Sequence, residues 1–137
     1  MTGFGSKKKV NKEIAKGEAF ILKTLELHSN NQIKDAEKNY ELLLTSGKKD
    51  SRVFNNYGVL CKQKGKIQKA KELFKKSIKL FPNKAEAYSN LSSILTSEGE
   101  LIEAEQCLKS AINIKPDFTD AMMNLSEIYS MQNKVKD

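Results

Sequence analysis

The chain has 137 residues, of which 39% are hydrophobic and 30% are charged, and its formal net charge is +7. This balance suits one soluble helical domain, and the longest apolar runs fall far short of the roughly 18 residues that a membrane-spanning helix needs. The composition therefore argues against a transmembrane protein.

The chain begins with a lysine-rich segment, residues 1–11, that shows no apolar periodicity, and we expect a disordered basic tail there. No apolar stretch long enough for a signal peptide follows the lysines. The two cysteines, Cys61 and Cys107, lie among apolar residues, where a free thiol behaves as a small hydrophobe. Together these features predict reduced thiols and a cytoplasmic protein.

From residue 12 onward the apolar residues follow a helical spacing, and the pattern repeats every 34 residues. Asn31, Gly65, Gly99 and Asn133 are each 34 residues apart, and all four tolerate the left-handed conformation that commonly ends a helix. We take each one as the turn between two paired helices. The pattern predicts helices, in chain order, at about residues 12–30, 32–46, 51–64, 66–81, 84–98, 100–114 and 118–132.

Other residues mark where these helices begin and end. Asn83 is followed three residues later by Glu86, as in a capping box. Pro82 and Pro116 end the second helix of two units, because proline cannot continue the hydrogen-bond ladder. The predicted N-caps are Asp50, Asn83 and Asp117.

Small and large residues also recur with the period of 34. Small residues in paired helices let the two backbones approach closely, and large residues around them fill the space between the helices. The small residues are Gly58, Ser92 and Ser126 in the first helices and Ala36, Ala70 and Ala104 in the second, with Tyr40, Phe74 or Leu108 four residues after each alanine.

These series resemble the tetratricopeptide repeat (TPR), whose signature is W-x-x-L-G-x-x-Y, then A-x-x-x-F, then P. The resemblance covers nearly the whole chain and implies an all-α fold, a superhelical solenoid of antiparallel helix pairs with about three and a half repeats. The third unit matches through Tyr88, Leu91, Ser92, Leu95, Gly99, Ala104, Leu108, Ala111 and Pro116. The implied domain covers residues 12–137 after the tail at 1–11, with repeats at about 17–50, 51–84 and 85–118 and a truncated unit at 119–137.

A second resemblance concerns the start of the chain. Residues 1–9 followed by such repeats are similar to the beginning of certain cyanobacterial multidomain TPR proteins, in which the repeats precede a catalytic domain, often a transferase or an oxygenase. This implies, as an alternative, a repeat module detached from its enzyme. The residues themselves supply no catalytic site, since His28 is the only histidine and no Gly-rich phosphate loop or nucleophile motif occurs. We expect a binding protein that is not an enzyme, with no metal and no cofactor.

The TPR resemblance implies that the first helix of each pair lines a concave groove that binds a peptide or a partner protein. By helical spacing, the stripe of those helices that is free of core packing includes Asn56, Asn90 and Asn124, which are 34 residues apart. A carboxamide is both donor and acceptor, so it can pair with the backbone of an extended peptide. This asparagine ladder resembles the one that lines the O-linked N-acetylglucosamine transferase repeats. The alternative is a consensus residue that bonds locally.

Neighbours of the ladder would set selectivity. The first repeat places the apolar residues Ile21, Leu22 and Leu25 near the groove, where they could hold an apolar anchor or be covered by Phe4 of the tail. The further candidate contacts are Arg52, Asn55, Gln63, Glu86, Ser93 and Glu127.

The charges at the groove argue against one known mode of TPR binding. The carboxylate clamp for chaperone tails needs basic residues at groove positions, whereas the third and fourth repeats present Glu86, Asp120 and Glu127 there. We therefore predict that a chaperone C-terminal tail is not the ligand.

Charge is also uneven along the chain. Residues 1–84 hold 20 Lys or Arg against 8 Asp or Glu, whereas residues 85–137 hold 4 against 9. The basic half suggests nonspecific nucleic-acid binding as an alternative, although a solvated lysine face explains the same pattern. Arg52 is the only arginine, and arginine is the side chain that best recognises phosphates and bases, so specific nucleic-acid binding is disfavoured.

The last predicted helix keeps the core residues Leu125 and Tyr129, but no complete partner helix follows it in this sequence. Solenoids normally end in a polar cap. We therefore expect an open C-terminal end that supports weak self-association.

Overall fold

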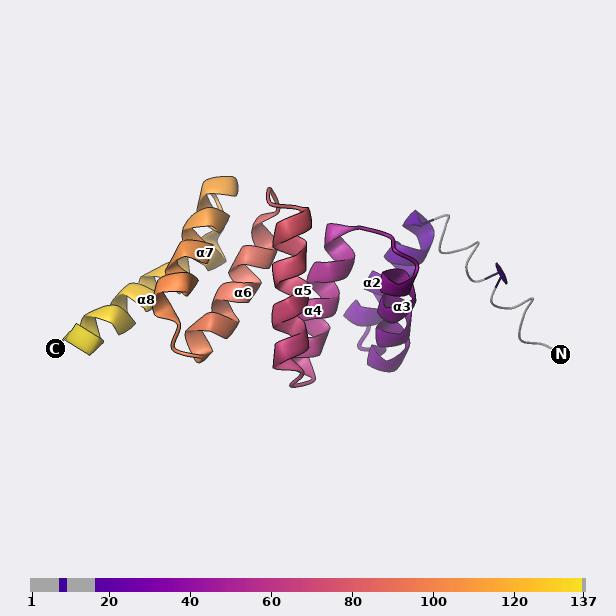
Figure 1. Cartoon of the computed structure of the whole chain (residues 1–137), viewed down its shortest axis with the longest axis horizontal. Coiled ribbons are helices and arrows are strands. Elements are labelled where there is room, and N and C mark those ends of the chain that lie inside the picture. The colour runs from indigo at the N-terminus through magenta and orange to yellow at the C-terminus, as the bar shows by residue number, and fades with distance from the viewer. Residues whose placement is uncertain (1–7, 10–16, 137) are drawn as a thin grey trace.

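The computed structural model describes residues 8–9 and 17–136 of the chain. The predicted tail at 1–11 and the predicted helix start at 12–16 therefore lie almost entirely outside the described residues. The helices are α2 (Glu18–Ser29), α3 (Ile33–Thr45), α4 (Ser51–Gln63), α5 (Ile67–Leu80), α6 (Ala85–Ser97), α7 (Leu101–Ile114) and α8 (Thr119–Lys136). They follow one another in an extended row from α2 to α8, as Figure 1 shows. No strand occurs in the described part, and none of its helices has the length and apolar content for a membrane crossing.

The same turn joins the helices of the first three pairs. Asn31, Gly65 and Gly99 have positive φ values of 62°, 78° and 80°, as predicted. Behind Gly65, the backbone N–H of Lys66 donates to the carbonyl of Cys61 at 2.8 Å. This bond satisfies a carbonyl that the end of α4 leaves open, and it forms only when the residue before Lys66 is left-handed. The period of 34 is thus a period of helix termination.

Three predicted helix ends are wrong. α8 begins at Thr119, so Phe118 and not the predicted Asp117 precedes the helix. Asn133 lies inside α8, because asparagine tolerates the left-handed conformation without requiring it and costs less than glycine within a helix. Asn83 is not the N-cap of α6: Lys84 holds that position, and no side chain caps the helix. Asp50 does cap α4, since its carboxylate accepts the backbone N–H of Arg52 at 2.9 Å.

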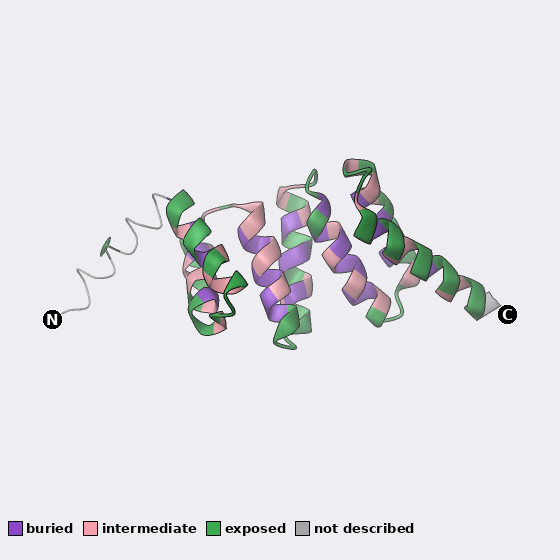
Figure 2. Cartoon of the chain, turned by 180° about the vertical axis from the view of Figure 1, so that it is seen from behind, coloured by how far each residue is buried: buried purple, intermediate pink, exposed green. Residues whose placement is uncertain are grey.

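The core lies between the two helices of each pair and between successive pairs. It includes the predicted alanines and the large residues one turn after them. Buried residues concentrate in the middle of the row, whereas α8 is mostly exposed (Figure 2). Cys61 is buried and Cys107 is half-buried, and neither is bonded to the other. The fully buried members of the two series are Ala36, Ala70, Ala104, Tyr40, Phe74 and Leu108.

The helices form two layers. Each first helix contacts the next one, α2 with α4, α4 with α6 and α6 with α8. The second helices α3, α5 and α7 make no comparable contact with one another. Because helices lie closest together on the inner side of a curved stack, the first helices face the concave side, and the candidate site lies there.

Candidate functional site

Three cavities lie along this face, one between each two successive first helices. The cavity between α2 and α4 has a volume of about 450 Å³, the cavity between α4 and α6 about 240 Å³, and the cavity between α6 and α8 about 290 Å³. We call them the N-terminal, central and C-terminal cavities. The N-terminal and C-terminal cavities use equivalent positions two repeats apart, toward the ends of the first helices, whereas the central cavity lies near the starts of α4 and α6.

The N-terminal cavity has an apolar wall. Leu25 of α2 and Val59 of α4 line it together with His28 and Gln63. The Nδ1 atom of His28 lies 2.9 Å from the hydroxyl of Tyr40, and its Nε2 atom lies 3.4 Å from Oε1 of Gln63, so both polar atoms of the ring have a partner.

The prediction that Ile21 lies near this groove is wrong. Ile21 is fully buried, whereas Leu22, the next residue, is 52% exposed. Successive residues of a helix point about 100° apart, so only one of the two can belong to the core. Leu22 occupies the position of the first repeat that Asn56 occupies in the second.

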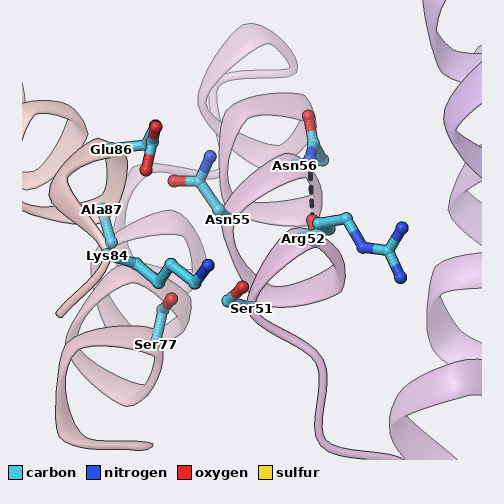
Figure 3. A pocket seen from close by; sticks show the side chains of 8 residues that line it. All are labelled: Ser51, Arg52, Asn55, Asn56, Ser77, Lys84, Glu86 and Ala87. Carbon is cyan, nitrogen blue, oxygen red and sulfur yellow. Dashed lines mark hydrogen bonds between the residues drawn. The ribbon is translucent and has the colours of Figure 1, made fainter. Parts of the chain in front are cut away.

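The central cavity, drawn in Figure 3, combines the beginnings of α4 and α6. Lys84 reaches toward Ser51, whereas the guanidinium of Arg52 points away, toward α2. The eight residues that line this cavity are Ser51, Arg52, Asn55, Asn56, Ser77, Lys84, Glu86 and Ala87.

Arg52 is already neutralised by the protein itself. Its guanidinium donates to both carboxylate oxygens of Glu18, at 2.8 and 2.7 Å, and to Oδ2 of Asp50 at 2.9 Å. The hydrogen bonds from Arg52 hold the pKa values of Asp50 and Glu18 below their usual range. Arg52 therefore fixes α2 against α4 more than it offers a free positive charge to a ligand.

The asparagines of the ladder are half-buried, and two of them already donate one hydrogen bond each. Nδ2 of Asn56 donates to the backbone carbonyl of Arg52 at 2.8 Å. Nδ2 of Asn90 donates to Oδ1 of Asn55 at 2.8 Å, which joins α6 to α4 across the concave face. The local bonding that was the alternative for these asparagines therefore occurs at Asn56, whereas the bond of Asn90 joins two repeats. Each of these carboxamides retains one N–H and its oxygen for another partner.

The C-terminal cavity is lined mainly by hydroxyl groups of α6. Opposite them, α8 contributes Asn124, Glu127 and Met131. The lining residues on α6 are Ser92, Ser93, Thr96 and Ser97.

Of the nine residues predicted as peptide contacts, all except Asn90 line one of the three cavities, and Asn90 bonds to a lining residue. The structure thus brings them to one face, while their role in binding stays a prediction. Ser77 was not among the predicted site residues, yet it lines the central cavity although it is only 1% exposed. A signal was present, because Leu43 and Ala111, one repeat before and after Ser77, are apolar.

The basic half of the chain is partly neutralised by ion pairs between neighbouring helices. These pairs use two lysines of the turn between α4 and α5 and two lysines of α5, which reduces the charge available to a polyanion. No group of three or more His, Cys, Asp or Glu side chains in residues 8–9 and 17–136 is placed to hold a metal. The pairs are Lys64 and Lys66 with Glu37, Lys69 with Glu41, and Lys71 with Glu98.

Comparisons with known proteins agree with this architecture. The family model described as tetratricopeptide repeat matches residues 62–117. No curated protein sequence matches the chain.

Solved structures resemble the whole solenoid. The first TPR of Spaghetti (RPAP3), bound to the HSP90 peptide SRMEEVD, is 15% identical with a TM-score of 0.77, and the match covers 84% of this chain and 91% of that one. MamA is 19% identical with a TM-score of 0.76, over 90% and 75% of the two chains. An O-GlcNAc transferase mutant from Thermobaculum terrenum is 20% identical with a TM-score of 0.73, over 93% of this chain but 23% of the transferase. At these identities the likeness shows the fold.

Proposed function

The chain is a tetratricopeptide-repeat solenoid, and from this premise we propose that its concave face binds an extended segment of a partner protein. The observation that carries the proposal is that a cavity lies between each two successive first helices, with the N-terminal and C-terminal cavities at equivalent positions two repeats apart. Asn56 lines both the N-terminal and the central cavity, and Asn124 lines the C-terminal one. A ligand that crosses the first helices passes every asparagine of the ladder.

The ladder would hold the backbone of the peptide. Asn56 and Asn90 each keep one N–H donor and one oxygen acceptor after their internal bonds, and these match the C=O and N–H of an extended chain. Such contacts do not depend on the ligand's side chains. Selectivity then comes from the cavities beside the ladder, through Arg52, Asn55, Gln63, Glu86, Ser93 and Glu127.

The ligand we propose differs from the acidic peptide bound to Spaghetti (RPAP3). Glu86, Asp120 and Glu127 are exposed and form no salt bridge within the described residues, so their charges would repel an acidic segment. Arg52, which lines the central cavity with Asn56, is already paired with Asp50 and Glu18.

Binding, rather than catalysis, is the activity we assign, and it calls for no cofactor. The cytoplasmic location inferred from the cysteines belongs to the same proposal. Attachment to a catalytic domain, as in the cyanobacterial proteins, and nonspecific nucleic-acid binding are the alternatives. A salt titration of binding to generic DNA and RNA separates the last of these, because polyanion binding weakens steeply with salt.

Weak self-association through α8 is a second proposal. Met122, Met123 and Tyr129 of α8 are 43%, 66% and 41% exposed, which is unusual for such large apolar side chains on one helix. Sedimentation over a wide range of concentrations tests it, and a strict monomer at the highest concentration contradicts it.

The main proposal is tested by selection of random dodecapeptides displayed on phage against the immobilised chain, followed by NMR mapping with a selected peptide. We expect the largest amide shifts in α2, α4, α6 and α8, at residues that line the three cavities. Failure to select any peptide, or shifts confined to the exposed faces of α3, α5 and α7, contradicts the proposal.

A further inference from the structure

The hydroxyl groups of the C-terminal cavity can only accept hydrogen bonds from a ligand. A hydroxyl has one proton and two lone pairs, and each of these four hydroxyls already donates its proton to a carbonyl of α6 about one turn earlier. The bonds run from Ser92 to Ser89 at 2.6 Å, from Ser93 to Asn90 at 3.2 Å, from Thr96 to Ser92 at 2.8 Å and from Ser97 to Ile94 at 2.7 Å.

The opposite wall adds further acceptors. The carboxylate of Glu127 is exposed and has no salt-bridge partner within the described residues. In its ionised form it has hydrogen-bond acceptors and no donor. Asn124 supplies one more oxygen and the only side-chain N–H donors among the lining residues. Met131, which is half-buried, provides an apolar surface. The cavity thus combines an excess of acceptors, one negative charge and one apolar contact.

A basic side chain of the protein already uses one of these acceptors. The Nζ atom of Lys62, at the end of α4, donates to Oγ of Ser93. Since the Ser93 hydroxyl donates to Asn90, its lone pairs are what faces Lys62. The wall of the cavity therefore accepts an ammonium group in the free protein.

We propose that the C-terminal cavity binds a basic side chain of the peptide, with arginine preferred over lysine. This inference rests on the proposed peptide-binding function. A guanidinium carries five N–H donors in a plane and no acceptor, which matches several hydroxyl oxygens and the carboxylate of Glu127 at once. The propyl stem of arginine fits against Met131, and a cavity of about 290 Å³ has room for the whole side chain. Lysine has only three donors, and its ammonium group would make the same kind of contact that Lys62 already makes with Ser93.

The test uses the phage selection and then one selected peptide in two synthetic forms, with arginine or with citrulline. Citrulline has nearly the shape of arginine but no charge. We expect selected peptides to share a basic position, and the citrulline form to bind wild-type protein at least about tenfold more weakly, as for loss of a charge-assisted contact. For the Glu127→Gln variant, replacing arginine by citrulline in the peptide should weaken binding by less than about threefold. Replacing arginine by lysine should give an intermediate loss.

Two variants serve as controls. Glu103→Gln removes an equal charge from an exposed position of α7, and it should keep the full difference between the two peptides. Lys62→Met should strengthen binding of the arginine peptide by about two- to fivefold, because it frees the Ser93 oxygen and removes a like charge. Selected peptides without a common basic position, or an unchanged citrulline effect in Glu127→Gln, overturn this inference alone. The absence of any selected peptide instead contradicts the peptide groove itself.

Discussion

A β-carbon placed on Gly58 would lie 2.5 Å from Cε1 of the Phe74 ring, which is fully buried. Gly58 in α4 and Phe74 in α5 thus fill one space together, and neither can grow without the other shrinking. In the next repeat the equivalent positions hold Ser92 and Leu108, a larger first residue with a smaller second one. The close approach of the paired helices depends on this match.

Gly58→Ala is expected to destabilise the protein by about 1–2 kcal/mol. Overpacking costs about 1–3 kcal/mol, and the better helix propensity of alanine returns up to about 1 kcal/mol of it. Urea unfolding followed by circular dichroism measures the change. In a protein that already carries Phe74→Leu, Gly58→Ala should change the free energy of unfolding very little. A double mutant whose two losses of stability simply add would contradict the shared space.

Ser77→Ala is expected to stabilise the protein by about 1 kcal/mol. The Ser77 hydroxyl is buried and has no hydrogen-bond partner within the described residues, and such a group loses its hydration without compensation. Ser92→Ala is the matched control, because Ser92 is equally buried but donates to the Ser89 carbonyl at 2.6 Å. Thermal unfolding compares the two, and equal effects of both substitutions would contradict the view that the Ser77 hydroxyl has no hydrogen-bond partner.

Asp50 is expected to give the protein an acid-sensitive contribution to stability. Hydrogen bonds from Arg52 hold the pKa of Asp50 below its ordinary value of 3.8. The folded state therefore binds this proton less readily than the unfolded chain, so the stabilisation is present above pH 4 and is lost as the pH falls through the lowered pKa. Asp50→Asn retains a capping side chain. It should lower the free energy of unfolding by about 1 kcal/mol at pH 6 but by almost nothing at pH 2. A constant cost from pH 2 to pH 6 would contradict this.

The two thiols are expected to react slowly in the folded protein. Burial raises the pKa of Cys107 to about 11 and also raises that of Cys61. At pH 8 only about 0.1% of Cys107 would be thiolate, so its reaction with a disulfide reagent should be about 100-fold slower than that of an ordinary thiol. Reaction in denaturant should be complete and fast. Rapid labelling of the native protein, or a Cys61–Cys107 disulfide found after mild alkylation, would contradict it.

The sequence predicted the solenoid well because its constraints are local and recur. A left-handed residue such as Gly65 ends a helix in every repeat, and the buried alanine that follows, such as Ala70, marks the contact between helices. Asn133 was misread because asparagine permits that conformation without enforcing it. The partners of polar side chains were not predictable, since the bond from Asn90 to Asn55 joins α6 to α4 and depends on how two repeats are placed in space.

The asparagine ladder is expected to contribute to peptide binding but not to supply most of the affinity. Each net hydrogen bond adds only about 0.5–1.5 kcal/mol, so three side chains with up to two bonds each provide at most several kcal/mol before ordering costs. Micromolar affinity requires about 8 kcal/mol. Replacing Asn56, Asn90 and Asn124 together by alanine should weaken binding of a selected peptide at least tenfold, about 1.4 kcal/mol.

Stability should change little in this triple variant. Asn56 loses a bond to the Arg52 carbonyl and Asn90 loses its bond to Asn55, but alanine is the better helix former at both positions. Asn113→Ala, on the exposed side of α7, is the matched control and should bind as wild type does. Fluorescence anisotropy with the labelled peptide measures the affinity, and circular dichroism confirms the fold. If the triple variant binds as tightly as wild type, the ladder is a set of consensus residues with local bonds, and the lysine-rich face of α5 becomes the better candidate for binding.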